Sequence, residues 1–145
     1  MSEGEPLVVP AIFLSDNVVR EWGTGKLYLI GVFAQWNCPR FPFQTPSFWI
    51  TAFMANFRAP ENTEYNITTN VEQVGSGQIL GSTSAKIRFN QAATPDKMLE
   101  IPFRMHTIIL QQQCSIRVVV LANEERIGER VFAVNSLTSP STTIG

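Results

Sequence analysis

The sequence predicts an all-β fold, a two-sheet antiparallel β-sandwich of about eight strands that is C2-like or immunoglobulin-like, with little or no helix. Segments rich in Val, Ile, Phe, Trp and Thr recur at short intervals, and Gly, Pro, Asn and Ser separate them. No long window has apolar residues at helical spacing, and β-branched residues crowd the apolar runs. Two packed sheets are the usual way to bury so many one-sided strands.

The expected strands follow one another along the whole chain. In LYLIGVF, which begins at Leu27, apolar positions alternate in the way that a strand requires, and DNVVREW before it is also extended. In SFWITAFMANF, every second residue from Phe48 to Met54 would line one face. In SIRVVVLAN, Ile116, Val118 and Val120 would do the same. The eight expected strands cover residues 8–21, 26–36, 47–57, 64–74, 78–90, 98–109, 114–122 and 127–134.

The sequence Gly23-Thr24-Gly25-Lys26 resembles part of a phosphate-binding loop. Such a loop leads into a helix and places Ser or Thr directly after its lysine. Here Leu27 follows the lysine, and the next residues form a strand pattern. We therefore expect a tight turn between two strands, in which the glycines supply positive φ angles.

Composition limits the classes of partner. The net charge is −1, and the 11 basic residues form no cluster, so nucleic-acid binding is disfavoured. No apolar run approaches the roughly 18 residues of a membrane span, and the acidic N-terminus is unlike a secretory signal. Two cysteines without an export signal indicate reduced thiols and a cytoplasmic protein. We expect one domain over residues 1–135 and a disordered polar tail over residues 136–145.

The stretch SDNVVREWGTGKLYLIGVF resembles the N-terminal signature of a group of bacterial and archaeal proteins of unknown function. That signature has an Asp, an apolar pair, a short turn and then G-K-L-x-L-I-G-[IV]-F. The matching residues are Asp16, Val18, Val19, Gly25, Lys26, Leu27, Leu29, Ile30, Gly31, Val32 and Phe33. FPFQTPSFWITAFM and IRVVVLANEERIGERVFAV are similar to later blocks of the group, which extends the resemblance over most of residues 11–135. The resemblance implies a small β-sandwich and no established activity.

The chain is poor in catalytic and metal-binding groups. Its single histidine, His106, would face Cys114 if the strands around Leu110 formed a hairpin, and such a pair can generate a thiolate nucleophile. No Gly-rich oxyanion turn surrounds this cysteine, and we expect a small buried hydrophobic residue instead. One His and two distant Cys do not make a zinc site, and two aspartates are too few for calcium-dependent membrane binding of the C2 kind. We expect no enzyme activity, no cofactor and no metal.

The segment FAQWNCPRFPFQTPSFW, residues 33–49, is the best candidate for a binding surface. Prolines restrict the backbone between its aromatic residues, and Trp, Phe and Arg are typical of binding hot spots. The expected partner-binding residues are Trp36, Arg40, Phe41 and Phe43. Whether the three aromatic residues among them lie on the surface or in the core stays open, and Trp49 is expected to close one end of the core.

Three functions are consistent with these features. The first is a non-catalytic module that binds a protein partner, or associates with itself, through an aromatic surface or a strand edge. The second is a carbohydrate-binding or small-ligand-binding sandwich, although ten Phe against three Trp and two Tyr provide few rings with a polar group. The third is a Cys-dependent enzyme, which the argument above disfavours.

Overall fold

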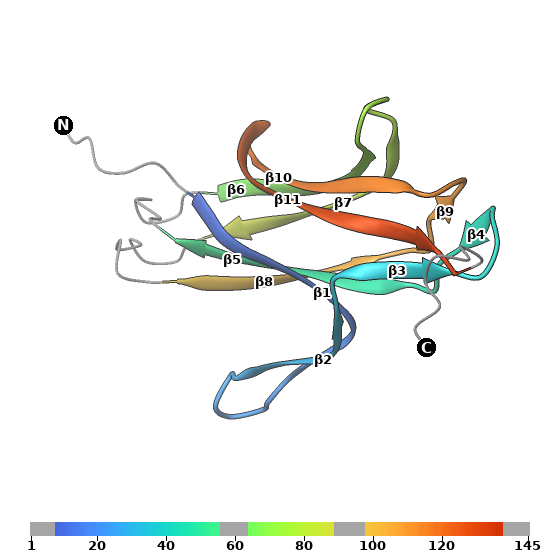
Figure 1. The fold of residues 1–145 in the computed structure, drawn as a ribbon. Coiled ribbons are helices and arrows are strands. Elements are labelled where there is room, and N and C mark those ends of the chain that lie inside the picture. The colour runs from blue at the N-terminus through green and yellow to red at the C-terminus, as the bar shows by residue number, and fades with distance from the viewer. Residues whose placement is uncertain (1–7, 56–63, 89–97, 138–145) are drawn as a thin grey trace.

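The computed structural model describes residues 8–55, 64–88 and 98–137, and these residues are all-β, with eleven strands and no helix (Figure 1). The prediction of an all-β fold is confirmed. The strands are β1 (Val8–Arg20), β2 (Leu27–Phe33), β3 (Gln35–Cys38), β4 (Phe43–Gln44), β5 (Phe48–Ala55), β6 (Glu64–Gln73), β7 (Ile79–Arg88), β8 (Leu99–Met105), β9 (Ile109–Leu110), β10 (Cys114–Ala122) and β11 (Glu125–Ser136).

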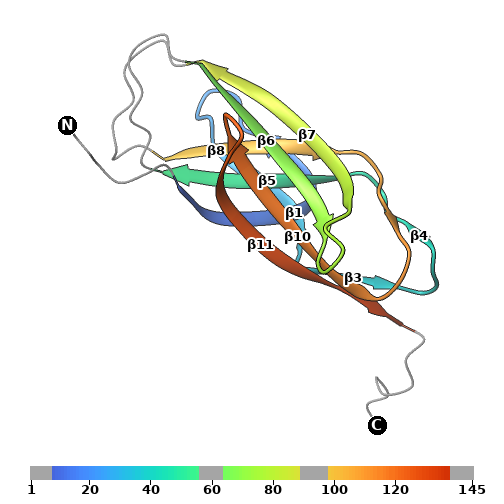
Figure 2. The same ribbon diagram turned by 90° about the horizontal axis from the view of Figure 1, so that it is seen from above.

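The described strands form three sheets. Sheet A has the order β2-β1-β5-β8, sheet B has the order β3-β11-β10-β6-β7, and β4 and β9 form a short ribbon at one end. Figures 1 and 2 show sheets A and B lying face to face as two layers. Beside this ribbon, two hydrogen bonds join Thr45 to Ile108. The Ile108 amide donates to the Thr45 hydroxyl, and the Thr45 amide donates to the Ile108 carbonyl.

The core lies between sheets A and B and follows the alternation of the strands. On β5, Phe48, Ile50, Ala52 and Met54 are all buried, as their period-2 spacing predicts. On β10, the residues from Ile116 to Val120 at the same spacing pack into the same cluster. Alternation in the sequence therefore identified correctly which face of these strands is buried.

The strand arrangement differs in detail from the prediction of about eight antiparallel strands in two sheets. The expected strand 26–36 is divided at Ala34, because the chain leaves sheet A after β2 and joins sheet B as β3. The expected strand 98–109 is likewise divided into β8 and β9. In addition, β3 runs parallel to β11, with Trp36 beside Val134, whereas the other strand pairs among the described residues are antiparallel.

Strand β1 changes partner halfway along its length. Its residues from Val8 to Ser15 pair with β5, whereas those from Leu14 to Arg20 pair with β2. Only Leu14 and Ser15 pair with both strands. Beyond this point the β1–β2 hairpin is free to leave the plane of sheet A.

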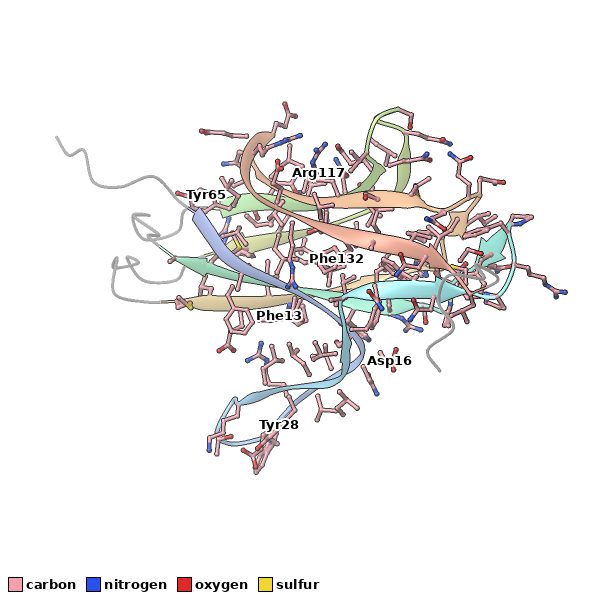
Figure 3. The ribbon with its side chains drawn as sticks, viewed as in Figure 1. Phe13, Asp16, Tyr28, Tyr65, Arg117 and Phe132 are labelled. Carbon is pink, nitrogen blue, oxygen red and sulfur yellow. The ribbon has the colours of Figure 1, made fainter. Side chains whose placement is uncertain are left out.

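The β1–β2 hairpin bends beneath the outer face of sheet A, below β5 and β8 in Figure 1, and Figure 2 shows it behind the same strands. At its far end, Arg20 donates a hydrogen bond to the Glu100 carbonyl on β8 and forms an ion pair with the Glu100 carboxylate at 3.6 Å. Side chains occupy the space between the hairpin and the sheet (Figure 3). As a result, Thr51 is fully buried although it lies on the side of β5 opposite the core.

The turn of this hairpin confirms the interpretation of the Gly-Thr-Gly-Lys sequence. Gly23 and Gly25 have φ angles of +95° and +75°, which glycine adopts readily. The Gly25 amide donates to the Glu21 carbonyl at 2.9 Å, and the Glu21 amide donates to the Lys26 carbonyl at 2.7 Å. These bonds close a β-hairpin connection, and β2 follows it as a strand.

Sheets A and B touch each other along both lateral sides of the two layers. On one side, Arg130 of β11 donates a 2.7 Å hydrogen bond to the Ile12 carbonyl of β1, and its guanidinium lies 4.8 Å from the centre of the Phe132 ring. Gly128 approaches Val9 on the same side. On the other side, Gly81 of β7 lies against Met105 of β8. The glycines allow the sheet edges to meet closely.

The described chain reaches its C-terminal limit just after β11. Most of the predicted tail, residues 136–145, lies outside the described residues. Ser136 is the last residue of β11, and the Leu137 amide donates to the Cys38 carbonyl at 2.9 Å. The described part of the chain contains no helix that is long and apolar enough to cross a membrane.

Replacing Gly128 by alanine should destabilise the fold. A Cβ atom there would lie 2.5 Å from the Val9 Cβ, so β1 and β11 would have to separate. We expect Gly128→Ala to lower the free energy of unfolding by about 1–3 kcal/mol in urea titrations. Ser84→Ala, on the exposed face of β7, is the control and should leave it unchanged; equal stability of the two variants would contradict this account of the sheet contact.

Candidate functional site

A hollow of about 310 Å³ lies where the β1–β2 bend meets β3 and the segment before β5. We call it the bend hollow. Its polar lining consists of the Asp16 carboxylate and the side chains of Gln35, Asn37 and Ser47. Asn37 is held in position, because its Oδ1 atom accepts hydrogen bonds from Gln35 at 3.5 Å and from Asn135 at 3.3 Å.

Aromatic side chains form the apolar part of the bend hollow. Phe33, Trp36 and Phe48 pack edge to face in one cluster, with ring centres 5.2 Å apart for Phe33 and Trp36 and 5.3 Å apart for Trp36 and Phe48. Phe43, from the end ribbon, lines the hollow beside them. Trp36 and Phe48 are nearly inaccessible, so Phe33 and Phe43 present most of the exposed ring surface.

The bend itself holds the charged group of the hollow. Asp16 lies opposite Gly31, which has a φ angle of +71°. The Asp16 carboxylate lies against Gly31 so closely that a Cβ atom there would collide with it. Figure 3 shows Asp16 at the bend, where β1 turns towards the hairpin. Asp16 is exposed and has no hydrogen-bond or ion-pair partner among the described residues.

The four residues predicted to bind a partner do not form one surface. Trp36 is only 7% exposed and belongs to the core, so it is not available to a partner. Phe41 and Phe43 are half-buried and pack against the core, and Phe43 also lines the bend hollow. Arg40 is exposed and does not line that hollow. Trp49, expected in the core, is half-buried on the outer face of sheet A.

Five exposed apolar side chains lie instead on or beside the β1–β2 hairpin, although Ile79, Met98, Ile109, Val131 and Leu137 in other parts of the described chain are exposed to a similar degree. Val19 pairs with Tyr28, so these two residues share one face of the hairpin with Ile30, two positions further along β2. Val32 lies beyond the bend at Gly31. The exposed fractions of these four side chains lie between 44% and 56%, and that of Trp22, in the turn, is 96%. We call these five residues the hairpin surface.

One pattern in the sequence indicates an exposed apolar surface on β2. The alternation in LYLIGVF carries apolar residues on both sides, because Leu27 and Leu29 alternate with Tyr28, Ile30 and Val32. A strand that is apolar on both sides is covered on both faces or leaves one face for a partner. Here Leu27 and Leu29 are half-buried, and the other side stays exposed.

The predicted Cys–His pair is not formed by a hairpin. His106 follows β8 in sheet A, whereas Cys114 begins β10 in sheet B, so these strands do not pair with each other. Burial raises the pKa of the Cys114 thiol above its ordinary value. Burial also raises the pKa of Cys38, and the nearby Cys114 raises it further. Both effects favour the protonated and unreactive thiol.

Other candidate sites among the described residues are weaker. These residues contain no group of three His, Cys, Asp or Glu side chains that could hold a metal ion. A second hollow, of about 340 Å³, lies beside the start of β7 and the approach to β9. Its lining includes neither a charged residue nor an aromatic ring. The bend hollow and the adjoining hairpin surface, which share Val32, are therefore the best candidates for binding.

Substitution of two tryptophans should change the free energy of unfolding to very different extents. Trp36→Ala removes a ring from the centre of the aromatic cluster, and we expect the free energy of unfolding to fall by about 3–5 kcal/mol. Trp22→Ala removes a ring that is almost fully exposed, and its effect should stay within about 0.5 kcal/mol. Urea titrations followed by circular dichroism would measure both; a stable Trp36→Ala variant would contradict the packing described above.

Alkylation tests the state of the cysteines. Because the pKa of each thiol is raised, the reactive thiolate is scarcer at pH 7 than in an unperturbed cysteine. We expect iodoacetamide to label the folded protein more slowly than a cysteine-containing peptide, and the rate to increase as the pH rises towards the pKa. Mass spectrometry of the labelled protein, with a urea-unfolded sample as the fast control, gives the rate at each site. Rapid labelling of Cys114 at neutral pH would support a nucleophilic role instead.

Comparisons with known proteins give a family but no activity. No curated protein matches the sequence. Among solved structures, the chain is 16% identical to the Pseudomonas fluorescens alkylpurine DNA glycosylase AlkC bound to DNA containing an abasic site analog, with a TM-score of 0.47 over 70% of this chain and 28% of that one. For a β-glucuronidase from glycoside hydrolase family 2, the identity is 12% and the TM-score is 0.43, over 70% of this chain and 12% of that one.

A third similar structure is an immunoglobulin-like protein from Pseudomonas aeruginosa, at 10% identity and a TM-score of 0.32, over 90% of this chain and 98% of that one. Likenesses with TM-scores below 0.5 carry no argument for a shared fold or activity. The family comparison is stronger, because one family model matches residues 10–135, which is most of the sequence. The chain belongs to this family, a family of unknown function (DUF6941).

Proposed function

We propose that this protein is a non-catalytic β-sandwich module, C2-like or immunoglobulin-like, that binds a protein partner through the hairpin surface. The observation that carries the proposal is the exposure of Val19, Tyr28 and Ile30 on one face of the hairpin, with Trp22 exposed in its turn and Val32 exposed beyond the bend at Gly31. The partner is a different protein or a second copy of this chain, and the two cases are separated by experiment below.

The chemistry of the hairpin surface suits a protein partner. Single exposed apolar residues are common on soluble proteins, but a contiguous group of them is typical of an interaction site. Tyr28 and Trp22 are of the residue types that contribute most to binding energy at interfaces. Strand β2 has no charged residue between Tyr28 and Val32, so a partner would cover this part of the strand with little cost of removing ions from water; at its turn end, the Tyr28 hydroxyl lies 3.5 Å from the Glu21 carboxylate.

The exposed edge of sheet A also favours the hairpin as the place where a partner binds. β2 is an edge strand, and one side of its backbone has no strand partner among the described residues. The edge strands β7 and β8 lie against each other between the two sheets, so they are less accessible. An extended segment of a partner that pairs with β2 would add main-chain hydrogen bonds to the apolar contact.

The proposal that the protein is not an enzyme rests on the state of its two cysteines and on the position of its histidine. Cys38 and Cys114 both have raised pKa values, and His106 follows a strand of sheet A whereas Cys114 begins a strand of sheet B. Both cysteines are free, which is consistent with a partner in the cytoplasm, where thiols stay reduced.

Carbohydrate binding is the alternative function. It is favoured by one feature, the almost fully exposed indole ring of Trp22, since such rings stack on sugars. The aliphatic residues Val19, Ile30 and Val32 beside it are better suited to a protein, because they offer a sugar no hydrogen bonds. Thermal stabilisation by members of a glycan panel, lost in Trp22→Ala, would favour the alternative.

A photo-crosslinking experiment tests the protein-binding function. Benzoylphenylalanine replaces Tyr28 on the hairpin surface or, as the control, Ser84 on the exposed face of β7. We expect a discrete adduct in the native host from position 28 and none from position 84. Because Ile30→Lys introduces a charge into the apolar contact, it should abolish the adduct without changing the thermal stability.

The same experiment separates the two kinds of partner. An adduct of twice the mass of the chain, together with a concentration-dependent mass in light scattering, indicates self-association. An adduct of another mass indicates a different protein. Equal adducts from positions 28 and 84, or an adduct unaffected by Ile30→Lys, would overturn the hairpin surface as the binding site.

A further inference from the structure

We propose that the bend hollow binds the guanidinium group of an arginine side chain, contributed by the protein partner that covers the hairpin surface. This inference rests on the proposed function, and it assigns to one pocket a ligand chemistry that can be tested separately.

Charge is the first argument. Asp16 is the one charged residue among the described residues that line the bend hollow. Its carboxylate is exposed and has no hydrogen-bond or ion-pair partner in the described part of the chain. A negative group at the edge of a pocket, with no neutralising neighbour, attracts a cationic ligand and disfavours an anionic one.

The second argument is the place of this carboxylate at the bend. Asp16 lies against Gly31, in the one place along β2 where the absence of a Cβ atom leaves room for it. The φ angle of +71° at Gly31 keeps the bend in a conformation that other residues rarely adopt. The backbone of the bend therefore brings the carboxylate to the lining of the hollow.

The remaining lining selects a flat cation on an apolar stem. The Gln35 side-chain oxygen and the Ser47 hydroxyl accept no hydrogen bond from the described residues, so both are available to N–H donors. Phe33 and Phe43 supply ring surface at the same hollow. A guanidinium pairs with a carboxylate through two parallel hydrogen bonds and also stacks on aromatic rings. The compact, strongly hydrated ammonium of lysine does this less well.

The third argument is the connection with the hairpin surface. Val32 belongs to both the hairpin surface and the lining of the bend hollow. A protein segment that lies over Ile30 and Val32 therefore passes the mouth of the hollow. The hollow, of about 310 Å³, is large enough to hold one arginine side chain.

Titration of the full-length protein with N-acetylarginine methylamide tests the assignment. Chemical shifts of the backbone amides of Gly31 and Gln35 report binding. We expect saturable binding by the arginine compound, weaker binding by the lysine analogue and none by the citrulline analogue, which has nearly the same shape but no charge. Binding should weaken as salt is added.

Two variants separate the carboxylate from general surface charge. Asp16→Asn keeps the shape of the side chain and removes its charge, and it should weaken binding of the arginine compound by about tenfold or more. Glu125→Gln removes an equivalent exposed charge at the start of β11 and should leave binding unchanged. Equal binding of arginine and citrulline, or unchanged binding to Asp16→Asn, would overturn the assignment.

The outcomes distinguish this inference from the function on which it rests. If Ile30→Lys abolishes the crosslink but arginine does not bind at the bend hollow, the hairpin surface stands and the arginine assignment fails. If arginine binds at the bend hollow but Asp16→Asn leaves the partner crosslink intact, the pocket is a site for free cations and the assignment to a partner side chain fails.

Discussion

The division of β1 between two partners is the constraint on which the rest of this structure depends. One half of the strand pairs with β5 and contributes to the core, and the other half pairs only with β2. Because the second half no longer pairs with β5, the hairpin can turn beneath β5 and β8 (Figure 1), and Thr51 is buried on the side of β5 away from the core. The same turn brings Asp16 against Gly31 and leaves the far face of β2 exposed. The bend hollow and the hairpin surface are therefore two results of one change of partner.

Much of the layered core could be predicted from the sequence, because alternation is a local property. Ile50 and Met54 on β5, or Ile116 and Val118 on β10, reveal their buried face through their spacing alone. The bend in β1 could not be predicted in this way, because it depends on which strand lies beside each half of β1. The available signals were the run of polar residues from Ser15 to Asn17 and the glycine within β2, which in a strand often marks a bend or a close approach.

The candidate site could be predicted only in part, because it too depends on contacts between segments that are distant in the sequence. Aromatic content led to Trp36, Phe41 and Phe43, but composition does not distinguish a ring in the core from a ring on the surface. Trp36 is buried because β3 pairs with β11, a strand that begins nearly ninety residues later in the sequence, and its ring then packs between Phe33 and Phe48. The exposure of Trp22 could not be predicted from the sequence, because a turn residue has no periodicity to indicate the direction of its side chain. Of the four predicted residues, Trp36 and Phe43 line the bend hollow, and of these two only Phe43 is more than marginally exposed.

The parallel pairing of β3 with β11 has a consequence for biosynthesis. Among the described residues, β11 is the only strand that pairs with β3, and it follows the other described strands in the sequence. During synthesis, Trp36 and Cys38 are therefore made well before the strand that pairs with their backbone. Contacts between such distant segments slow folding and leave apolar groups open to chaperones in the meantime. Strand β3 reaches its native pairing only after β11 has been translated.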